Sequence, residues 1–231
     1  MASYGQFCPV AMAAEIISER WSLLVIRELI AGSSRFGEIQ NGVPTMSTSL
    51  LARRLKELEN AGVIERHSDG GKRNITYSLT QSGEELIPVV EMLGVWGQRW
   101  VASDVKDDEL DPSLLMWDMR RGLNIDQMPE ERTVVQFEFD DVDKLGMKRW
   151  WLVKDRGDVD LCLTDPGFEV DVEVRSNIRP MVDVWMGRIG LPFAMGSGAI
   201  EVDGTPRMVR EFPGWLKLNL FAEHAVPGAT G

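Results

Sequence analysis

The stretch TMSTSLLARRLKELENAGVIERHSDGGKRNITYSL, Thr45 to Leu79, decides the fold of the first half of this 231-residue chain. Ser47 precedes a helical pattern over residues 48–60, and its hydroxyl can accept from the free amides of a first helical turn. Gly62 marks the end of that helix. At 100° per residue, the apolar positions fall on one face: Leu51, Leu55 and Leu58. We therefore predict a capped amphipathic helix whose outer face is small and basic.

A hairpin follows this helix in the same stretch. VIERHS and NITYSL have the composition of strands, and the segment between them contains the Asp-Gly signal of a tight turn. Alternation along the second strand points three side chains inward: Ile75, Tyr77 and Leu79. The cationic residues Lys72 and Arg73 then lie at the tip of the hairpin.

The flanking sequence adds helices on both sides. Apolar spacing from Pro9 to Ala31 predicts two helices that meet near Ser18–Trp21, and a short helix is expected over Ser34–Gln40. Thr80–Val101 is again helical, with Pro88 kinking or dividing it. Five of its residues are expected to point inward: Leu86, Val89, Leu93, Trp96 and Trp100. Helix, short helix, turn, capped helix and hairpin is the order of a winged helix-turn-helix.

Charge decides where a nucleic acid could bind. The chain has a formal net charge of -11, so a polyanion needs a locally cationic face. Residues 1–102 are nearly neutral, and most of the acidity lies in residues 103–231. We predict DNA contacts from the outer helix face, the preceding short helix and the hairpin tip: Arg35, Ser47, Thr48, Ser49, Ala52, Arg53, Lys56, Lys72 and Arg73. The alternative is a solvated helix with salt bridges such as Arg53 to Glu57.

The second half begins after an acidic break, ASDVKDDELDP. Asp111 and Pro112 then supply a helix cap and a first helical residue. Four alternating segments suggest an antiparallel meander: TVVQFEF, KRWWLVK, DVDLCLT and FEVDVEV. A helix over Ile178–Arg188, a small-residue loop LPFAMGSG and a strand AIEVDG follow. The fold class is α+β, with regions 1–102, 103–130 (an acidic linker and helix) and 131–231, the last having a mainly antiparallel sheet.

Residues 8–100 resemble the HxlR-type winged-helix transcriptional regulators. The segments that carry the resemblance are CPVAMAAEIISERWSLLVIREL, RFGEIQNGVPTMSTSLLARRLKELENAGVIER and YSLTQSGEELIPVVEMLGVWGQRW. The resemblance implies binding to double-stranded DNA as a homodimer, in which the N-terminal helix and the helix after the wing make the dimer contacts. By position, the recognition helix would be Ser47–Asn60 and the wing Glu65–Asn74. Cys8 before Pro9 matches a Cys-Pro that some of these regulators use as a redox sensor, although an inert structural cysteine is the alternative.

Residues 130–222 are similar to the sterol-carrier-protein-2-like fold, an α+β layer around a lipid-sized apolar cavity. IRPMVDVWMGRIGLPFAMGSGAIEVDGTPRMVREF parallels its helix, loop, strand and terminal helix. Five of the eight tryptophans and eight of the twelve methionines lie from residue 116 onward, and such side chains suit an adaptable pocket. Candidate residues for an apolar small molecule or lipid are Trp151, Met181, Trp185, Met186, Phe193 and Met195. Each could instead be ordinary core.

The sequence contains no pattern that indicates catalysis or metal binding. His67 and His224 are the only histidines, and no Cys, His or carboxylate cluster has metal-ligand spacing. We expect no enzyme, cofactor or metal, and a cytoplasmic chain without a membrane span or signal peptide. The sequence thus favours a dimeric DNA-binding transcriptional regulator that is gated by an apolar ligand. The alternative is a lipid-binding or enzymatic protein that uses the winged helix only for dimerisation.

Overall fold

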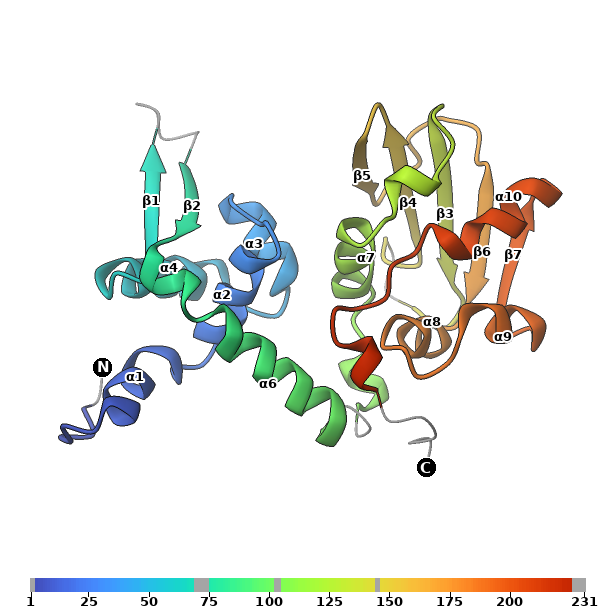
Figure 1. The fold of residues 1–231 in the computed structure, drawn as a ribbon. Coiled ribbons are helices and arrows are strands. Elements are labelled where there is room, and N and C mark those ends of the chain that lie inside the picture. The colour runs from blue at the N-terminus through green and yellow to red at the C-terminus, as the bar shows by residue number, and fades with distance from the viewer. Residues whose placement is uncertain (1–2, 69–74, 102–104, 144–145, 226–231) are drawn as a thin grey trace. The chain divides into compact units, whose positions relative to one another are not determined.

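The chain forms two compact units, Met1–Gly94 and Val95–Gly231, each with its own hydrophobic core. The computed structural model describes residues 3–68, 75–101, 105–143 and 146–225 (Figure 1). The division between the units falls inside one helix, α6 (Ile87–Trp100). Among the described residues, no helix has both the length and the apolar character needed to cross a lipid bilayer.

The N-terminal unit has the predicted order of elements. Its elements are α1 (Pro9–Ile17), α2 (Ser22–Ile30), α3 (Phe36–Gly42), α4 (Thr48–Asn60), β1 (Ile64–Ser68), β2 (Ile75–Leu79), α5 (Gln81–Glu84) and the start of α6. The predicted break between the first two helices is confirmed, because Trp21 adopts a positive φ of 81° just before α2. The cap of α4 is also confirmed, since Leu50 N donates to Ser47 Oγ at 3.4 Å.

The predicted inner face of α4 forms the centre of this unit's core. Leu51, Leu55 and Leu58 are buried together with residues of α2 and α3. β1 and β2 form the antiparallel hairpin, with Ile64 opposite Leu79 and Ser68 opposite Ile75. Tyr77 and Leu79 pack against the same core, so the hairpin is fixed to the helices at its base.

The helix predicted over Thr80–Val101 is divided, and its apolar side chains are mostly not inward. α5 ends at Glu84 and α6 begins at Ile87, with Pro88 as the second residue of α6, where its missing N–H costs no helical hydrogen bond. Leu86 packs on the core as expected. The inward prediction is wrong for the other four residues, whose exposed fractions range from 40% to 71%: Val89, Leu93, Trp96 and Trp100.

The C-terminal unit is a five-stranded mixed sheet with helices. Its elements are η2 (Asp107–Glu109), α7 (Pro112–Arg121), η3 (Ile125–Gln127), β3 (Thr133–Phe139), β4 (Arg149–Asp155), β5 (Asp158–Cys162), β6 (Val172–Ser176), α8 (Ile178–Trp185), α9 (Leu191–Gly196), β7 (Ile200–Gly204), α10 (Pro206–Glu211), η4 (Phe212–Gly214) and η5 (Ala222–His224). α7 starts at Pro112 with Asp111 as its cap, as predicted. α7, α8, α9 and η4 contribute to one large core on one face of the sheet.

The order of the strands is β5-β4-β3-β6-β7, and it corrects the predicted meander. β3, β4 and β5 do follow one another as antiparallel neighbours. β6 instead lies on the other side of β3 and runs parallel to it, with Val135 opposite Val172. Because β3 is buried along most of its length, it needs hydrogen-bonding partners on both sides and becomes the central strand.

Two local predictions in this unit also need correction. The helix expected over Ile178–Arg188 ends at Trp185, before Gly187 takes a positive φ of 76°. The segment LPFAMGSG, expected to be a loop, contains α9, with Leu191 and Ala194 buried in the core. Pro192 lies in the first turn of that helix, where proline is well tolerated.

Candidate nucleic-acid interface

The outer face of α4 is exposed along its whole length. Ser47, Thr48, Ser49, Ala52, Arg53 and Lys56 are all exposed. The leucines on the opposite face are buried, so the helix is fixed with this one side turned to solvent. Small residues at the N-terminal end let the helix approach a groove closely, and the two cations follow one turn later. This is the geometry of a recognition helix.

Neighbouring arginines of α4 have different environments. The Arg53 side chain is 65% exposed and its Nε lies 3.5 Å from Glu57 Oε1, which is the salt bridge considered in the alternative interpretation. The Arg54 side chain is only 4% exposed; it donates to Glu57 Oε2 at 2.6 Å and lies 3.4 Å from Glu19 Oε2. Arg54 therefore joins α4 to the α1–α2 corner, whereas Arg53 is available to a partner.

We expect Arg54→Ala to lower the free energy of unfolding by about 2 kcal/mol, because it removes a buried charge that two carboxylates share. Urea unfolding followed by circular dichroism measures this change. Lys56→Ala is the matched control on the exposed face, and it should change stability by less than about 0.5 kcal/mol. Equal stabilities of the two variants would contradict a structural role for Arg54.

Arg35 lies at the start of α3, next to the wing. Burial alone would raise the pKa of Glu38, but backbone N–H groups of Ser34 and Arg35 donate to its carboxylate, and the net effect is a lowered pKa. Arg35 also pairs with Thr76 of β2 in an isolated bridge. Tyr77 N donates to Ser34 O at 2.7 Å. The backbone that carries the exposed Arg35 side chain is thus held beside β2.

The predicted hairpin contacts are only partly within the described structure. Lys72 and Arg73, with the rest of 69–74, lie outside the described residues. On β1, Arg66 is exposed and stands opposite Tyr77. The sequence prediction did not include it, because strand alternation places Arg66 on the same face as the buried Ile64. On the other face of the hairpin, His67 and Glu65 both contact Ser78 Oγ, at 2.8 and 3.1 Å.

A buried glutamate holds α3 in place, and no sequence pattern had indicated it. Glu28 of α2 is fully buried and receives hydrogen bonds from Arg27 Nη2 at 2.7 Å and Ser33 Oγ at 3.1 Å. Arg27 Nη2 also donates to Gly42 O at 2.8 Å. A Cβ on Gly42 would lie 1.9 Å from the Glu28 carboxyl group, so glycine lets the end of α3 close onto this carboxylate. This network sets the path from α3 into α4.

The six residues predicted to bind an apolar ligand lie in different surroundings. Met181 is buried in the main core, and Trp185 and Met195 pack against it. Trp151 belongs to a separate small cluster with Val134 and Val153. Phe193 is 70% exposed. Met186 follows α8, and its backbone oxygen accepts from Gln98 Nε2 at 2.9 Å. The structure does not bring these six side chains together around one cavity.

The two cysteines differ in accessibility. Cys8 is exposed at the N-cap of α1. Its role as a redox sensor or as an inert residue stays a prediction. Cys162 on β5 is half-buried, and its burial, together with the charge of Asp160, raises the pKa of the thiol. A raised pKa lowers the fraction of Cys162 that is present as the reactive thiolate.

The N-terminal unit is a winged helix-turn-helix domain, and comparison with known proteins agrees. Residues 16–105 match the family described as HxlR-like helix-turn-helix. The uncharacterized HTH-type transcriptional regulator YvaP of Bacillus subtilis (strain 168) is 37% identical over 99 residues, which cover 42% of this chain and 92% of YvaP. The HTH-type transcriptional regulator YodB of the same organism is 34% identical over 95 residues, covering 40% and 85% of the two chains.

A solved structure, the reduced form of YodB from B. subtilis, has 33% sequence identity and a TM-score of 0.36, covering 42% of this chain and 96% of that one. The chain described here belongs to the HxlR-like helix-turn-helix family. Its N-terminal unit is therefore an HxlR-type transcriptional regulator domain, and the family match ends at residue 105.

Proposed function

We propose that this chain regulates transcription by binding double-stranded DNA, with α4 in the major groove and the wing on the adjacent backbone or minor groove. The observation that carries this proposal is the exposed face of α4, where Arg53 and Lys56 stand beyond the small residues Ser49 and Ala52. Arginine and lysine can donate to guanine edges or to phosphates. Arg66 on β1 and Arg35 beside β2 add exposed cationic side chains.

Gel-shift titration against the DNA upstream of the protein's own gene tests this proposal. Specific binding should persist over excess unrelated DNA, and it should weaken as salt rises because phosphate contacts release counterions. Absence of a shift at any salt concentration would instead favour the alternative function, in which the winged helix serves only for dimerisation.

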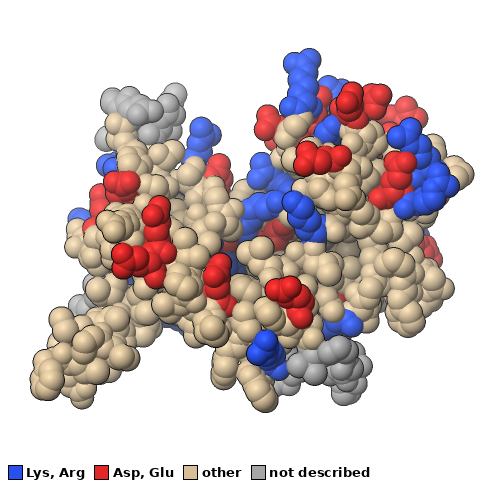
Figure 2. Space-filling model, viewed as in Figure 1, with Lys and Arg blue, Asp and Glu red and all other residues tan. Residues whose placement is uncertain are grey.

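We further propose that the regulator is a homodimer formed through α1, the segment before it and α6. Large apolar side chains of these segments are exposed in the single chain: Tyr4, Phe7, Val10, Met12, Val89, Met92, Leu93, Trp96, Trp100 and Val101. Figure 2 shows α1 as a protrusion without charged atoms on the visible face. So many large apolar side chains exposed on these segments are unusual on a monomer and typical of an interface.

Met92→Glu combined with Trp96→Glu should shift the protein from dimer to monomer, because each places a charge where apolar burial is proposed. Light scattering after size-exclusion chromatography measures the mass directly. Phe193→Glu is the matched control, since Phe193 is equally exposed but lies on α9. A dimer that survives the α6 substitutions, or an unsubstituted chain that is already a monomer, would contradict this interface.

The C-terminal unit is proposed to bind an organic ligand that modulates DNA affinity. A ligand changes that affinity only if it binds the DNA-competent and DNA-incompetent arrangements with different strengths. The experiment is to repeat the DNA titration with and without compounds that raise the unfolding temperature. A compound that stabilises the protein but leaves DNA affinity unchanged would show binding without gating.

A further inference from the structure

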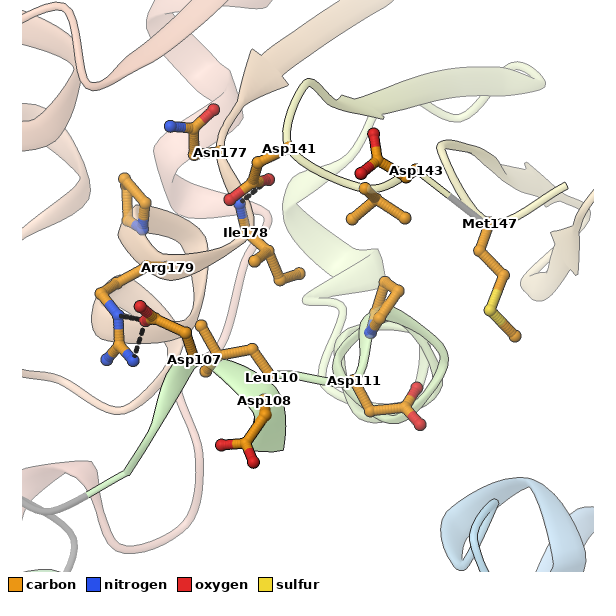
Figure 3. A pocket seen from close by; sticks show the side chains of 13 residues that line it. Asp107, Asp108, Leu110, Asp111, Asp141, Asp143, Met147, Asn177, Ile178 and Arg179 are labelled. Atoms are coloured by element: carbon orange, nitrogen blue, oxygen red, sulfur yellow. Dashed lines mark hydrogen bonds and ion pairs between the residues drawn. The ribbon is translucent and has the colours of Figure 1, made fainter. Parts of the chain in front are cut away.

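A cavity of about 800 Å³ lies in the C-terminal unit, and its lining comes from segments far apart in the sequence (Figure 3). η2, the start of α7, the segment after β3 and the start of α8 all contribute. The lining residues are Asp107, Asp108, Leu110, Asp111, Pro112, Asp141, Val142, Asp143, Met147, Asn177, Ile178, Arg179 and Pro180. Volumes of this size are common for sites that bind small organic molecules.

One part of the lining is apolar and continuous with the hydrophobic core. Ile178 belongs to the main core, and Leu110, Val142 and Met147 pack against it. Met147 adds a flexible, polarizable side chain that can adapt to the shape of an occupant. A ligand in this cavity can therefore bury an apolar body, which a small hydrated metal ion does not have.

The other part of the lining is strongly acidic, with five aspartates and one arginine. Three of the aspartates already have partners in the protein. Arg179 Nε donates to Asp107 Oδ1 at 2.7 Å, Ser113 N donates to Asp111 Oδ1 at 2.8 Å, and Ile178 N donates to Asp141 Oδ1 at 2.9 Å. In Figure 3, the Arg179–Asp107 pair and Asp143 lie on different sides of the cavity.

The remaining two aspartates, Asp108 and Asp143, are exposed and make no hydrogen bond or ion pair with any described residue. The helix ends at the cavity do not favour an anion, because Asp111 and Asp141 occupy the first-turn amides of α7 and α8. Two carboxylates without partners beside a low-dielectric apolar wall instead attract positive charge more strongly than they would in open water.

We propose that this cavity binds a lipophilic organic cation, with its apolar body against Leu110, Met147 and Ile178 and its charge near Asp108 and Asp143. This inference names the ligand class for the C-terminal unit and so rests on the proposed ligand binding there. It does not depend on DNA binding. The site also differs from the six tryptophan, methionine and phenylalanine candidates of the sequence prediction, none of which lines this cavity.

The test compares two probes of nearly the same shape and opposite charge, tetraphenylphosphonium and tetraphenylborate, by equilibrium dialysis against the full chain. Tetraphenylphosphonium should bind at least about tenfold more tightly, equivalent to 1.4 kcal/mol. The proposal would be overturned if the two probes bound equally or if the anion bound more tightly. It would also be overturned if the cation did not bind at concentrations up to about 1 mM, which corresponds to a binding free energy of only about 4 kcal/mol.

Asp108→Asn with Asp143→Asn should weaken tetraphenylphosphonium binding by about tenfold per carboxylate. Since neither side chain holds another described residue, the unfolding temperature without ligand should not fall. Asp158→Asn with Asp160→Asn on β5 is the matched control, because it removes the same charge from exposed positions outside the cavity. Equal weakening in both double variants would mean that net charge alone attracts the cation, and the proposed site would be wrong.

Gel shifts on the same samples keep the two proposals separate. If the chain binds the cation but no DNA, the cavity proposal stands and the proposed regulator function is wrong. If the chain binds DNA but does not prefer the cation over the anion, only the cavity proposal is wrong.

Discussion

Replacing Gly83 with alanine should lower the free energy of unfolding by about 3 kcal/mol, at the upper end of what overpacking a tight site costs. Gly83 is buried in α5, and an added Cβ would lie 2.2 Å from the backbone oxygen of Val63. That oxygen cannot move away easily, because it accepts from both the N–H and the hydroxyl of Thr80, each at 3.1 Å. The substitution must therefore separate α5 from the start of β1.

Urea unfolding of Gly83→Ala and Gly37→Ala measures this effect with an internal control. The chemical change is the same, but a Cβ on Gly37 of α3 has no atom within 4 Å. Alanine there should be neutral or stabilise the fold by up to about 1 kcal/mol, because glycine is the poorer helix former. If both variants unfold alike, the close approach of α5 to Val63 is not what makes glycine necessary.

Arg53→Ala combined with Lys56→Ala should reduce specific DNA affinity by about a hundredfold. Each cation that contacts a base edge contributes roughly 1–3 kcal/mol, and a phosphate contact also adds about one unit to the salt slope. Arg53 must leave Glu57, 3.5 Å away, to reach DNA. The exposed Arg53–Glu57 ion pair contributes little free energy, so breaking it subtracts little from the free energy of DNA binding.

Fluorescence anisotropy with labelled operator DNA at several salt concentrations gives both the affinity and the slope. Arg207→Ala with Arg210→Ala on α10 is the charge-matched control, since both arginines are exposed and lie in the C-terminal unit. If the DNA affinity of the α4 variant is unchanged, or if the α10 variant loses as much DNA affinity, then α4 is not the helix that recognises DNA. Circular dichroism should show that all variants remain folded.

Local signals made the N-terminal unit predictable from sequence. The Ser47 cap, the leucine spacing of α4 and the alternation of the two strands act within a few residues, and the structure has the predicted helix and paired strands at those places. The outer face of α4 followed from the same periodicity. The apolar stripe of α6 was misassigned because spacing identifies an apolar face but not what covers it. The burial of Arg54 depends on Glu19, which is 35 residues away.

The fold of the C-terminal unit, its cavity and the Glu28 network beside the DNA interface depend on contacts between residues far apart in the sequence, so they could not be predicted from local patterns. The strands were found from their alternation, but the parallel pairing of β3 with β6 depends on which neighbour best covers a buried strand. The cavity needs Asp108, Asp143 and Ile178 from three separate segments, and no short motif connects them. Glu28 was missed because a single buried carboxylate has no pattern in the sequence.

The strand order of the C-terminal unit also has a consequence for how the chain is made. β4 and β5 are joined across Arg156 and Gly157, so this hairpin closes a very short loop. β3 and β6 are joined over a separation of 37 residues, seen between Val134 and Asp171. During synthesis on the ribosome, β3 therefore has one unpaired edge until β6 emerges, and throughout that interval this edge can add a strand from another nascent chain.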